Sequence, residues 1–136
     1  MKIGNIKIGK NFRPKIIAEI SGNHNGSLKK AIKLIESAKK AGADFVKLQT
    51  YTADTITLNS SNKDFQIKDK NSLWNGNTLH KLYEKAHTPW EWHKKLFSVA
   101  KKNKISIFST PFDESAVDFL EKLNVPAYKI SSFENN

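Results

Sequence analysis

The sequence predicts an α/β protein built as the N-terminal half of a (β/α)8 barrel, a TIM barrel, whose strands 1–4 are preceded by a small β-hairpin. Short apolar, β-branched segments alternate with amphipathic helical segments, and most links between them are short. No helical segment follows the last predicted strand. Because an all-parallel sheet needs cover on both faces, we expect the remaining strands of the barrel to lie outside these residues.

The predicted strands follow from turn residues and from the spacing of apolar side chains. Residues 1–15 should form a hairpin cap, because Ile3, Ile6 and Ile8 alternate with lysine and with Gly-Asn turn residues. Residues 16–136 should form the half-barrel. Its strands are expected at Lys15–Ser21, Phe45–Thr50, Ser106–Thr110 and Ala127–Ser131.

Helical segments separate these strands. The first has Ser27 as its expected N-cap and Gly42 as its stop signal. After a long polar insertion, "TPWE" predicts another start with Thr88 as N-cap and Glu91 closing a capping box, and a last helix is expected at 114–123. The positions expected to face inward are Leu28, Ala31, Ile32, Ile35, Ala38, Leu79, Leu82, Tyr83, Ala86, Trp92, Leu96, Val99, Val117 and Leu120.

The composition limits the classes of partner. The formal charge is +10, but only Arg13 among the 23 basic residues is an arginine, and the lysines are scattered along helices. Arginine is the usual bidentate reader of bases and phosphates, so a basic nucleic-acid-binding protein is a disfavoured alternative. Cysteine is absent and no apolar run approaches the about 20 residues of a membrane span. We expect a soluble cytoplasmic protein that contacts no membrane.

Polar side chains fall at the carboxyl ends of all the predicted strands. Parallel strands bring these ends to one rim, where βα barrels build their sites. Strand alternation places Lys47 and Gln49 on one face, away from Val46 and Leu48. The polar residues on the rim are Glu19, Lys47, Gln49, Thr110, Lys129, Ser131 and Ser132.

Two lysines near a common interior need partners, because burying an unpaired ammonium group is costly. A substrate phosphate or carboxylate would satisfy Lys47 and Lys129 together. Alternatively, Glu19 pairs with one lysine while the other reaches solvent along its aliphatic stem. A third possibility is a Schiff-base aldolase in which Lys47 or Lys129 is a desolvated nucleophile.

The histidines do not predict a metal site. His24, His80, His87 and His93 include no ligand pair at i, i+4 spacing with a nearby carboxylate. His24 lies in the first strand–helix turn, where it either lines the rim or is an ordinary loop residue. The tryptophans are expected to pack around helix starts.

Three ordered motifs resemble a known family. The segments "IAEISGNHNGS", "AGADFVKLQTYTADT" and "FSTPFDESAVDFLEKLNVPAYKISSFE", between Ile16 and Glu134, closely resemble the N-terminal half of the sialic acid synthases, the phosphoenolpyruvate-dependent nonulosonic acid synthases. Within that family, "TYTADTITLNS", "TPWEWH" and "SSFE" are most similar to the members that use a diacetamido-trideoxy-altrose. The sialic and legionaminic acid synthases, which use other amino sugars, are the nearest alternatives.

The resemblance implies a metal-dependent condensation of phosphoenolpyruvate with an open-chain amino sugar. The enol carbon attacks the sugar aldehyde, water adds to the resulting cationic centre, and phosphate leaves with C–O cleavage. By the same resemblance, Gln49 and Glu134 contact the sugar or the attacking water, and Glu19 orients that network. Four rim residues bind the phosphate and carboxylate of phosphoenolpyruvate: Lys47, Thr110, Lys129 and Ser132.

The resemblance also implies parts of the protein beyond this sequence. A divalent metal of the Mn²⁺ or Mg²⁺ type is held by two histidines on later strands, so we expect no metal ligand in this chain. A C-terminal antifreeze-like (SAF) domain reaches into the partner subunit's site, which implies a homodimer. We therefore expect the 136 residues to be inactive alone.

Overall fold

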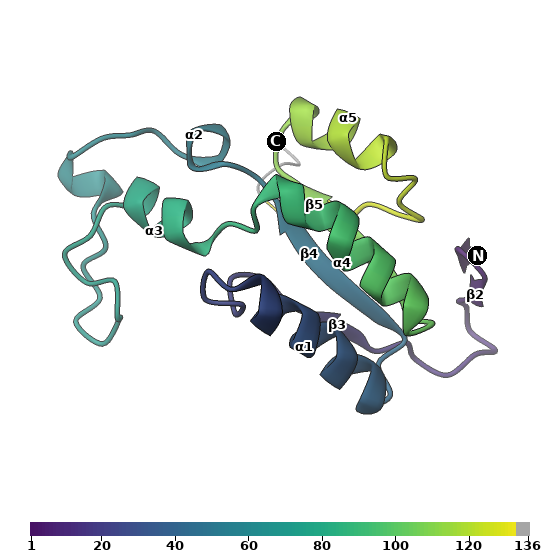
Figure 1. Ribbon diagram of the computed structural model, residues 1–136. Helices are drawn as coiled ribbons and strands as arrows, with labels where there is room; N and C mark the ends of the chain where they lie inside the picture. Colours follow the sequence, from purple (N-terminus) through teal and green to yellow (C-terminus); the bar gives the residue numbers. More distant parts are fainter. Residues whose placement is uncertain (133–136) are drawn as a thin grey trace.

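The computed structural model describes residues 1–132 and contains a three-stranded parallel sheet with two long helices packed on one face (Figure 1). The strands, in spatial order, are β3 (Ile17–Glu19), β4 (Phe45–Thr50) and β5 (Ser106–Pro111). Helix α1 (Leu28–Lys40) connects β3 to β4, and α4 (Trp90–Lys102) precedes β5. The predicted α/β class and parallel pairing are confirmed, and the order of the strands is that of the first strands of a (β/α)8 barrel.

A small antiparallel hairpin precedes the sheet, as predicted. Strand β1 (Lys2–Ile3) pairs with β2 (Ile6–Lys7), and Gly4 in the turn has a left-handed φ of 55°. A Cβ atom at Gly4 would lie 3.9 Å from Ser106 Oγ at the start of β5. The hairpin therefore sits at the amino end of the sheet, as Figure 1 shows.

Between β4 and α4 the chain makes a long excursion beyond the carboxyl ends of the strands (Figure 1). Its elements are α2 (Ala53–Ile56), the 3-10 helix η1 (Lys63–Phe65) and α3 (Leu79–Ala86). Each begins after a polar residue whose side chain accepts a backbone N–H bond, which satisfies one of the free donors of a helix start. These N-caps are Thr52, Asn62 and Thr78.

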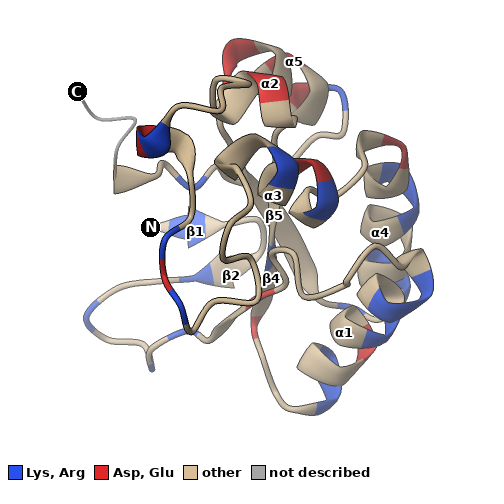
Figure 2. Ribbon diagram, turned by 90° about the vertical axis from the view of Figure 1, so that its left-hand side faces the viewer, with Lys and Arg blue, Asp and Glu red and all other residues tan. Residues whose placement is uncertain are grey.

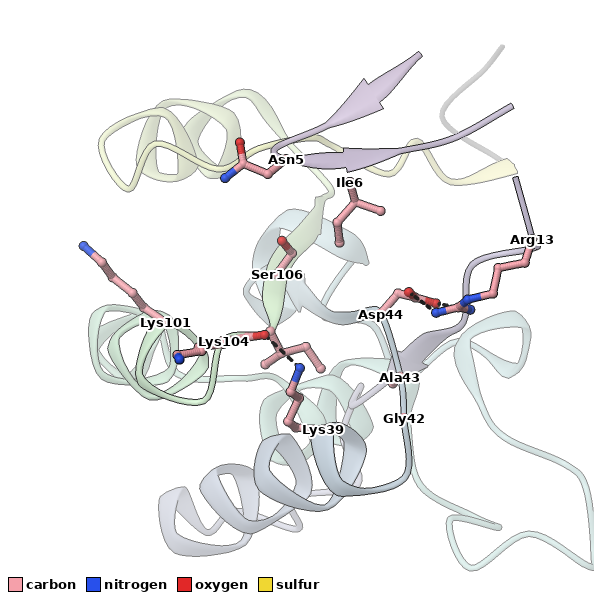
Figure 3. Close-up of a pocket in the computed structure, with 11 residues that line it drawn as sticks. Asn5, Ile6, Arg13, Lys39, Gly42, Ala43, Asp44, Lys101, Lys104 and Ser106 are labelled. Carbon is pink, nitrogen blue, oxygen red and sulfur yellow. Dashed lines mark hydrogen bonds and ion pairs between the residues drawn. The ribbon is translucent and has the colours of Figure 1, made fainter. Parts of the chain in front are cut away.

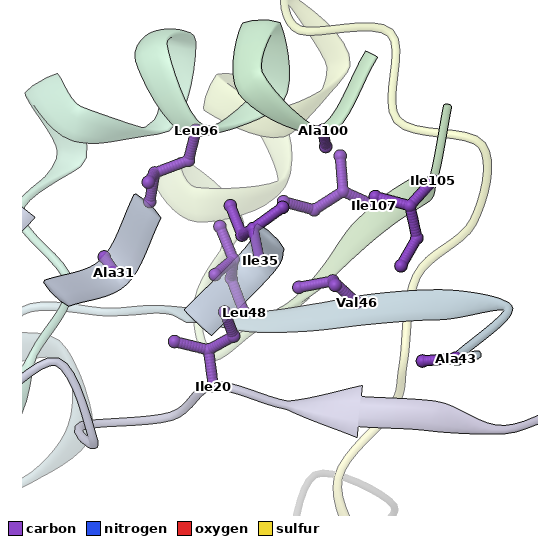
Figure 4. Packing of buried hydrophobic residues seen from close by; sticks show 10 residues of the cluster. All are labelled: Ile20, Ala31, Ile35, Ala43, Val46, Leu48, Leu96, Ala100, Ile105 and Ile107. Carbon is purple, nitrogen blue, oxygen red and sulfur yellow. The ribbon is translucent and has the colours of Figure 1, made fainter. Parts of the chain in front are cut away.

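The core lies between the sheet and helices α1 and α4 (Figure 4). Val46 and Leu48 of β4 are fully buried there, and Ile107 of β5 is 6% exposed. They pack against the inward stripes of the helices, where apolar residues recur every three or four positions. Fully burying an aliphatic side chain of this size contributes about 1.5–3 kcal/mol. The fully buried helix residues of the cluster are Ala31, Ile35, Leu96 and Ala100.

The start of α4 differs from the predicted capping box. Pro89 occupies the N-cap position and makes no side-chain cap hydrogen bond, and Thr88 lies one residue earlier. The Oγ1 atom of Thr88 lies 3.2 Å from Nε2 of His24, and both residues are buried. A buried imidazole needs a hydrogen-bond partner, so this contact takes the hydroxyl that the capping box would have used.

The predicted strand Ala127–Ser131 is reduced to a single bridge. Tyr128 pairs in parallel with Ser109, and the Lys129 N–H donates to the Ser109 carbonyl at 3.1 Å. Pro126 has no N–H to add to the ladder, and within residues 1–132 no strand lies on the far side of this segment. Helix α5 (Glu114–Glu121) also ends two residues before the predicted boundary.

Lys and Arg residues, coloured blue in Figure 2, recur along α1 and α4 and also occur in the hairpin and the loops. Lysines dominate α1 and α4, in which Glu36 and Glu91 are the only acidic residues. Within residues 1–132, no helix combines the length and the apolar character needed to cross a membrane.

Candidate functional site

The strand register places four predicted site residues on one face of the sheet. Glu19 pairs with Lys47 across β3 and β4, and Gln49 pairs with Thr110 across β4 and β5. Register partners in neighbouring parallel strands point to the same side, as do residues two apart along a strand. The four side chains therefore project away from the helix-packed core, as the alternation predicted for Lys47 and Gln49.

Lys47 is the central cation of this face. Its Nζ forms an ion pair with Glu19 Oε2 and donates to Thr110 Oγ1 at 3.5 Å. The Lys47 side chain is only 14% exposed, whereas that of Glu19 is 39% exposed. The ion pair considered as an alternative from the sequence is therefore present. The ion pair engages the lysine Nζ that a Schiff-base nucleophile would need free to attack a carbonyl group.

A tight turn after β3 connects Glu19 to Gln49. The Ser21 Oγ donates to Gln49 Oε1 at 2.7 Å, and the Ser21 N–H donates to Glu19 Oε1 at 3.0 Å. Ser21 has a left-handed φ of 45°, which is uncommon for a residue with a side chain and is typical of functional turns. Sequence reasoning missed Ser21, although its position at the end of a strand and before Gly-Asn was a usable signal.

Lys129 and Ser132 are not in contact with this cluster. Lys129 is exposed and its Nζ donates to Ser131 Oγ at 3.3 Å, and Ser132 is exposed as well. The hydroxyl of Tyr128 bonds to Glu121 of α5 on the outer side, so alternation directs Lys129 toward the side of Lys47. The roles predicted for Lys129 and Ser132 stay predictions, and Glu134 lies outside the described residues.

A buried polar network holds the same strand ends from the helix side. Thr50 Oγ1 lies 2.9 Å from His93 Nε2 and 2.7 Å from Ser109 Oγ, and all three residues are fully buried. Thr50 directly follows Gln49, and Ser109 directly precedes Thr110. These bonds therefore tie together the ends of β4 and β5 that carry the site. Sequence reasoning missed this network, although hydroxyl residues in two apolar strands were a signal for it.

The buried histidines serve the fold and do not fit a metal site. Burial lowers the pKa of His93 to about 4 and also lowers the pKa of His24, so both rings are neutral at pH 7. The Nε2 atom of His80 lies 2.8 Å from an oxygen of Asp54. Within residues 1–132, no three His, Cys, Asp or Glu side chains come together as a ligand set.

The fold and the site define a βα-barrel type of protein with a polar site at the carboxyl ends of its strands. The chain belongs to the NeuB family, whose sequence profile matches residues 34–136.

Its relatives include named synthases. The chain is 51% identical over 136 residues to the pseudaminic acid synthase of Campylobacter jejuni, and 51% identical over 121 residues to that of Helicobacter pylori. These alignments cover 100% and 89% of this chain but only 38% and 35% of the two relatives. The N,N'-diacetyllegionaminic acid synthase of C. jejuni is more distant, at 40% identity over 120 residues, 88% of this chain and 35% of the relative. The chain thus spans little more than a third of the relatives' length.

Solved structures support the fold. The N-acetylneuraminic acid synthetase of Leptospira borgpetersenii, in complex with citrate, matches with a TM-score of 0.79 and 30% identity over 98% of this chain and 41% of that one. The spore coat polysaccharide biosynthesis protein SpsE of Bacillus subtilis matches with a TM-score of 0.72 and 33% identity, over 98% and 34%. The α/β class with a parallel sheet is therefore shared with both.

His93 should make folding sensitive to mild acid. Its pKa of about 4 in the folded chain lies below its ordinary value of 6.5, so unfolding takes up a proton between these values. Stability should be complete above about pH 6.5 and fall as the pH drops toward 4, with a loss of about 2 kcal/mol by pH 5. Urea unfolding of the wild type and of His93→Gln at pH 7 and pH 5 measures the effect. Equal losses in both proteins would show that His93 is not its source.

Proposed function

We propose that this chain supplies the phosphoenolpyruvate-binding part of a nonulosonic acid synthase, and that the whole protein condenses phosphoenolpyruvate with an amino sugar. The observation that carries the proposal is Lys47 beside Thr110 at the carboxyl ends of neighbouring parallel strands. The higher identity to pseudaminic acid synthases, 51% against 40% for a legionaminic acid synthase, favours a diacetamido-trideoxy-altrose as the acceptor.

Lys47 and Thr110 would anchor the anionic groups of phosphoenolpyruvate. An ammonium group and a hydroxyl 3.5 Å apart can both donate to one phosphate or carboxylate. Thr110 is 1% exposed, and a hydrogen bond between the Thr50 and Ser109 hydroxyls joins the ends of β4 and β5. The donor groups of Lys47 and Thr110 are therefore attached to a backbone that moves little. Donors held in place in this way stabilise charge as it develops on a leaving phosphate. We place Lys129 and Ser132 as additional ligands of the same anion.

Glu19 would act as the resident competitor of that anion. Its carboxylate engages the ammonium group that phosphoenolpyruvate needs, so binding must exchange one anion for the other. Glu19 is partly exposed and is also held by the Ser21 N–H, so it can leave Lys47 without losing every partner. Once released, it would orient Gln49 through Ser21, together with the attacking water.

The remaining parts of the proposal concern the whole protein. The members of this family named as synthases in the comparisons support a small-molecule reaction. A divalent metal and a homodimer are proposed from the sequence resemblance alone, and a cytoplasmic location is proposed from the composition, which lacks cysteine. The metal ligands would come from outside residues 1–132, and the same is proposed of the residues that complete the sugar site.

Phosphate release from phosphoenolpyruvate tests the activity directly. The complete protein should release phosphate with diacetamido-trideoxy-altrose, and less efficiently with the acceptors of sialic and legionaminic acid synthases. The chain of 136 residues should release none, because the rest of the barrel is needed. Turnover by this chain alone, or a preference for another acceptor, would contradict the respective half of the proposal.

Two substitutions at the ion pair should change phosphoenolpyruvate affinity in opposite directions. Lys47→Met removes a charge-assisted bond, and such bonds contribute about 1.5–3 kcal/mol, so the Kd should rise about ten-fold or more. Glu19→Gln removes the competing carboxylate and should lower the Kd, while kcat falls because the orienting group is lost. Calorimetric titration of the complete protein with phosphoenolpyruvate, without acceptor, measures the Kd of both variants. Phosphate release in the presence of acceptor measures kcat. Weaker binding in both variants would reject Glu19 as a competitor.

A further inference from the structure

A basic cavity lies at the amino end of the sheet, opposite the candidate site (Figure 3). It has a volume of about 560 Å³ and lies between the hairpin, the start of β5 and the ends of α1 and α4. Asn5 and Ser106 contribute uncharged polar groups to its lining. The charged residues around it are Arg13, Lys39, Asp44, Lys101 and Lys104.

Asp44 does not balance the lysines of this cavity. Its two oxygens accept bonds from Arg13 at 2.7 and 3.0 Å, and Oδ2 also accepts the Ile16 N–H at 2.9 Å. The Ile16 bond first, and then Arg13 and Lys15, lower the pKa of Asp44. The Asp44 carboxylate is therefore paired with Arg13 and the Ile16 N–H rather than with the lysines of the cavity. Within residues 1–132, the three lysines of the cavity form no ion pair with a carboxylate.

Lys39 holds a fixed position between two helix ends. Its Nζ donates to the carbonyl of Lys104 at 3.0 Å, and Figure 3 shows this ammonium group between the ends of α1 and α4. In Figure 3 the Lys104 side chain lies next to α4, and the Lys101 side chain extends away from Ser106 and Lys39. A Cβ atom at Gly42 would meet no atom within 4 Å, so the turn after α1 leaves space for a ligand.

The interaction of lysines with helix ends does not account for the whole cluster. Cations in the last turn of a helix are favourable because they face free carbonyl groups, and Lys39 and Lys101 occupy such positions. Lys104 comes from a non-helical segment and lines the same cavity. Like charges gathered around one cavity repel each other, and a bound anion would remove that repulsion.

We propose that this cavity binds a small phosphorylated metabolite, with its phosphate held by Lys39 and Lys104 and its polar body against Asn5 and Ser106. A cavity of this volume is within the range of small-molecule sites. The ligand class follows from the lysines that lack a carboxylate partner and from the two uncharged donors beside them. This second site is separate from Lys47 and does not rest on the proposed synthase activity.

An NMR titration of the chain with pyrophosphate at constant ionic strength tests the inference. The amide signals of Gly42, Ala43 and Ser106 should shift and saturate together. Lys39→Gln and Lys104→Gln should each weaken binding about five-fold or more, since each removes a charge-assisted bond. Lys94→Gln is the matched control, because Lys94 is an exposed lysine of α4 outside the cavity lining and should leave the Kd unchanged.

Three results would overturn the inference. The first is the absence of saturable shifts, and the second is an equal loss of affinity in Lys94→Gln, which would indicate general attraction to a basic surface. The third is a set of shifts confined to Gln49 and Thr110, which would place the anion at the carboxyl ends of the strands. The variant spectra report folding in the same experiment, and a failed synthase assay leaves all of these readings unchanged.

Discussion

The register between β3, β4 and β5 places the Lys47 ammonium group between Glu19 and Thr110, and the rest of the site depends on this contact. A lysine with a side chain only 14% exposed is tolerable in a sheet because a carboxylate and a hydroxyl reach it. A slip of one residue would turn Lys47 into the helix-packed core and expose Val46 and Leu48. The burial of those apolar side chains therefore specifies which polar side chains form the site.

The two faces of each strand end have separate tasks. On the helix side, the fully buried Thr50 and Ser109 bond to each other, and Thr50 also bonds to His93, which leaves little freedom to the backbone of β4 and β5. Gln49 precedes Thr50 in the sequence and Thr110 follows Ser109, and both point to the opposite side. Their backbone is therefore held in place by the same hydrogen bonds. Rigid support from behind is what a binding site needs from its scaffold.

Much of the fold could be predicted because it depends on local pattern. The predicted strand Phe45–Thr50 has the same bounds as the observed β4, and strand alternation placed Lys47 and Gln49 on the correct face. The failures occurred where a distant residue decides the outcome. Thr88 was a good N-cap by local rules, but His24, 64 residues away in sequence, takes its hydroxyl.

Other features could not be predicted because they need partners that the pattern does not name. The network of Thr50, His93 and Ser109 joins three separate elements, and the Ser21 bond to Gln49 joins residues 28 apart. The predicted strand Ala127–Ser131 has a suitable composition, but a strand needs a ladder, and only Tyr128 forms a bridge to β5 among the described residues.

The most direct test of the central claim is a crystal structure of the complete protein with phosphoenolpyruvate bound. We predict that a phosphate or carboxylate group of the ligand lies within hydrogen-bond distance of Lys47 Nζ and Thr110 Oγ1, and that Glu19 no longer contacts Lys47. Phosphoenolpyruvate bound elsewhere, with the Lys47–Glu19 ion pair intact, would contradict the account.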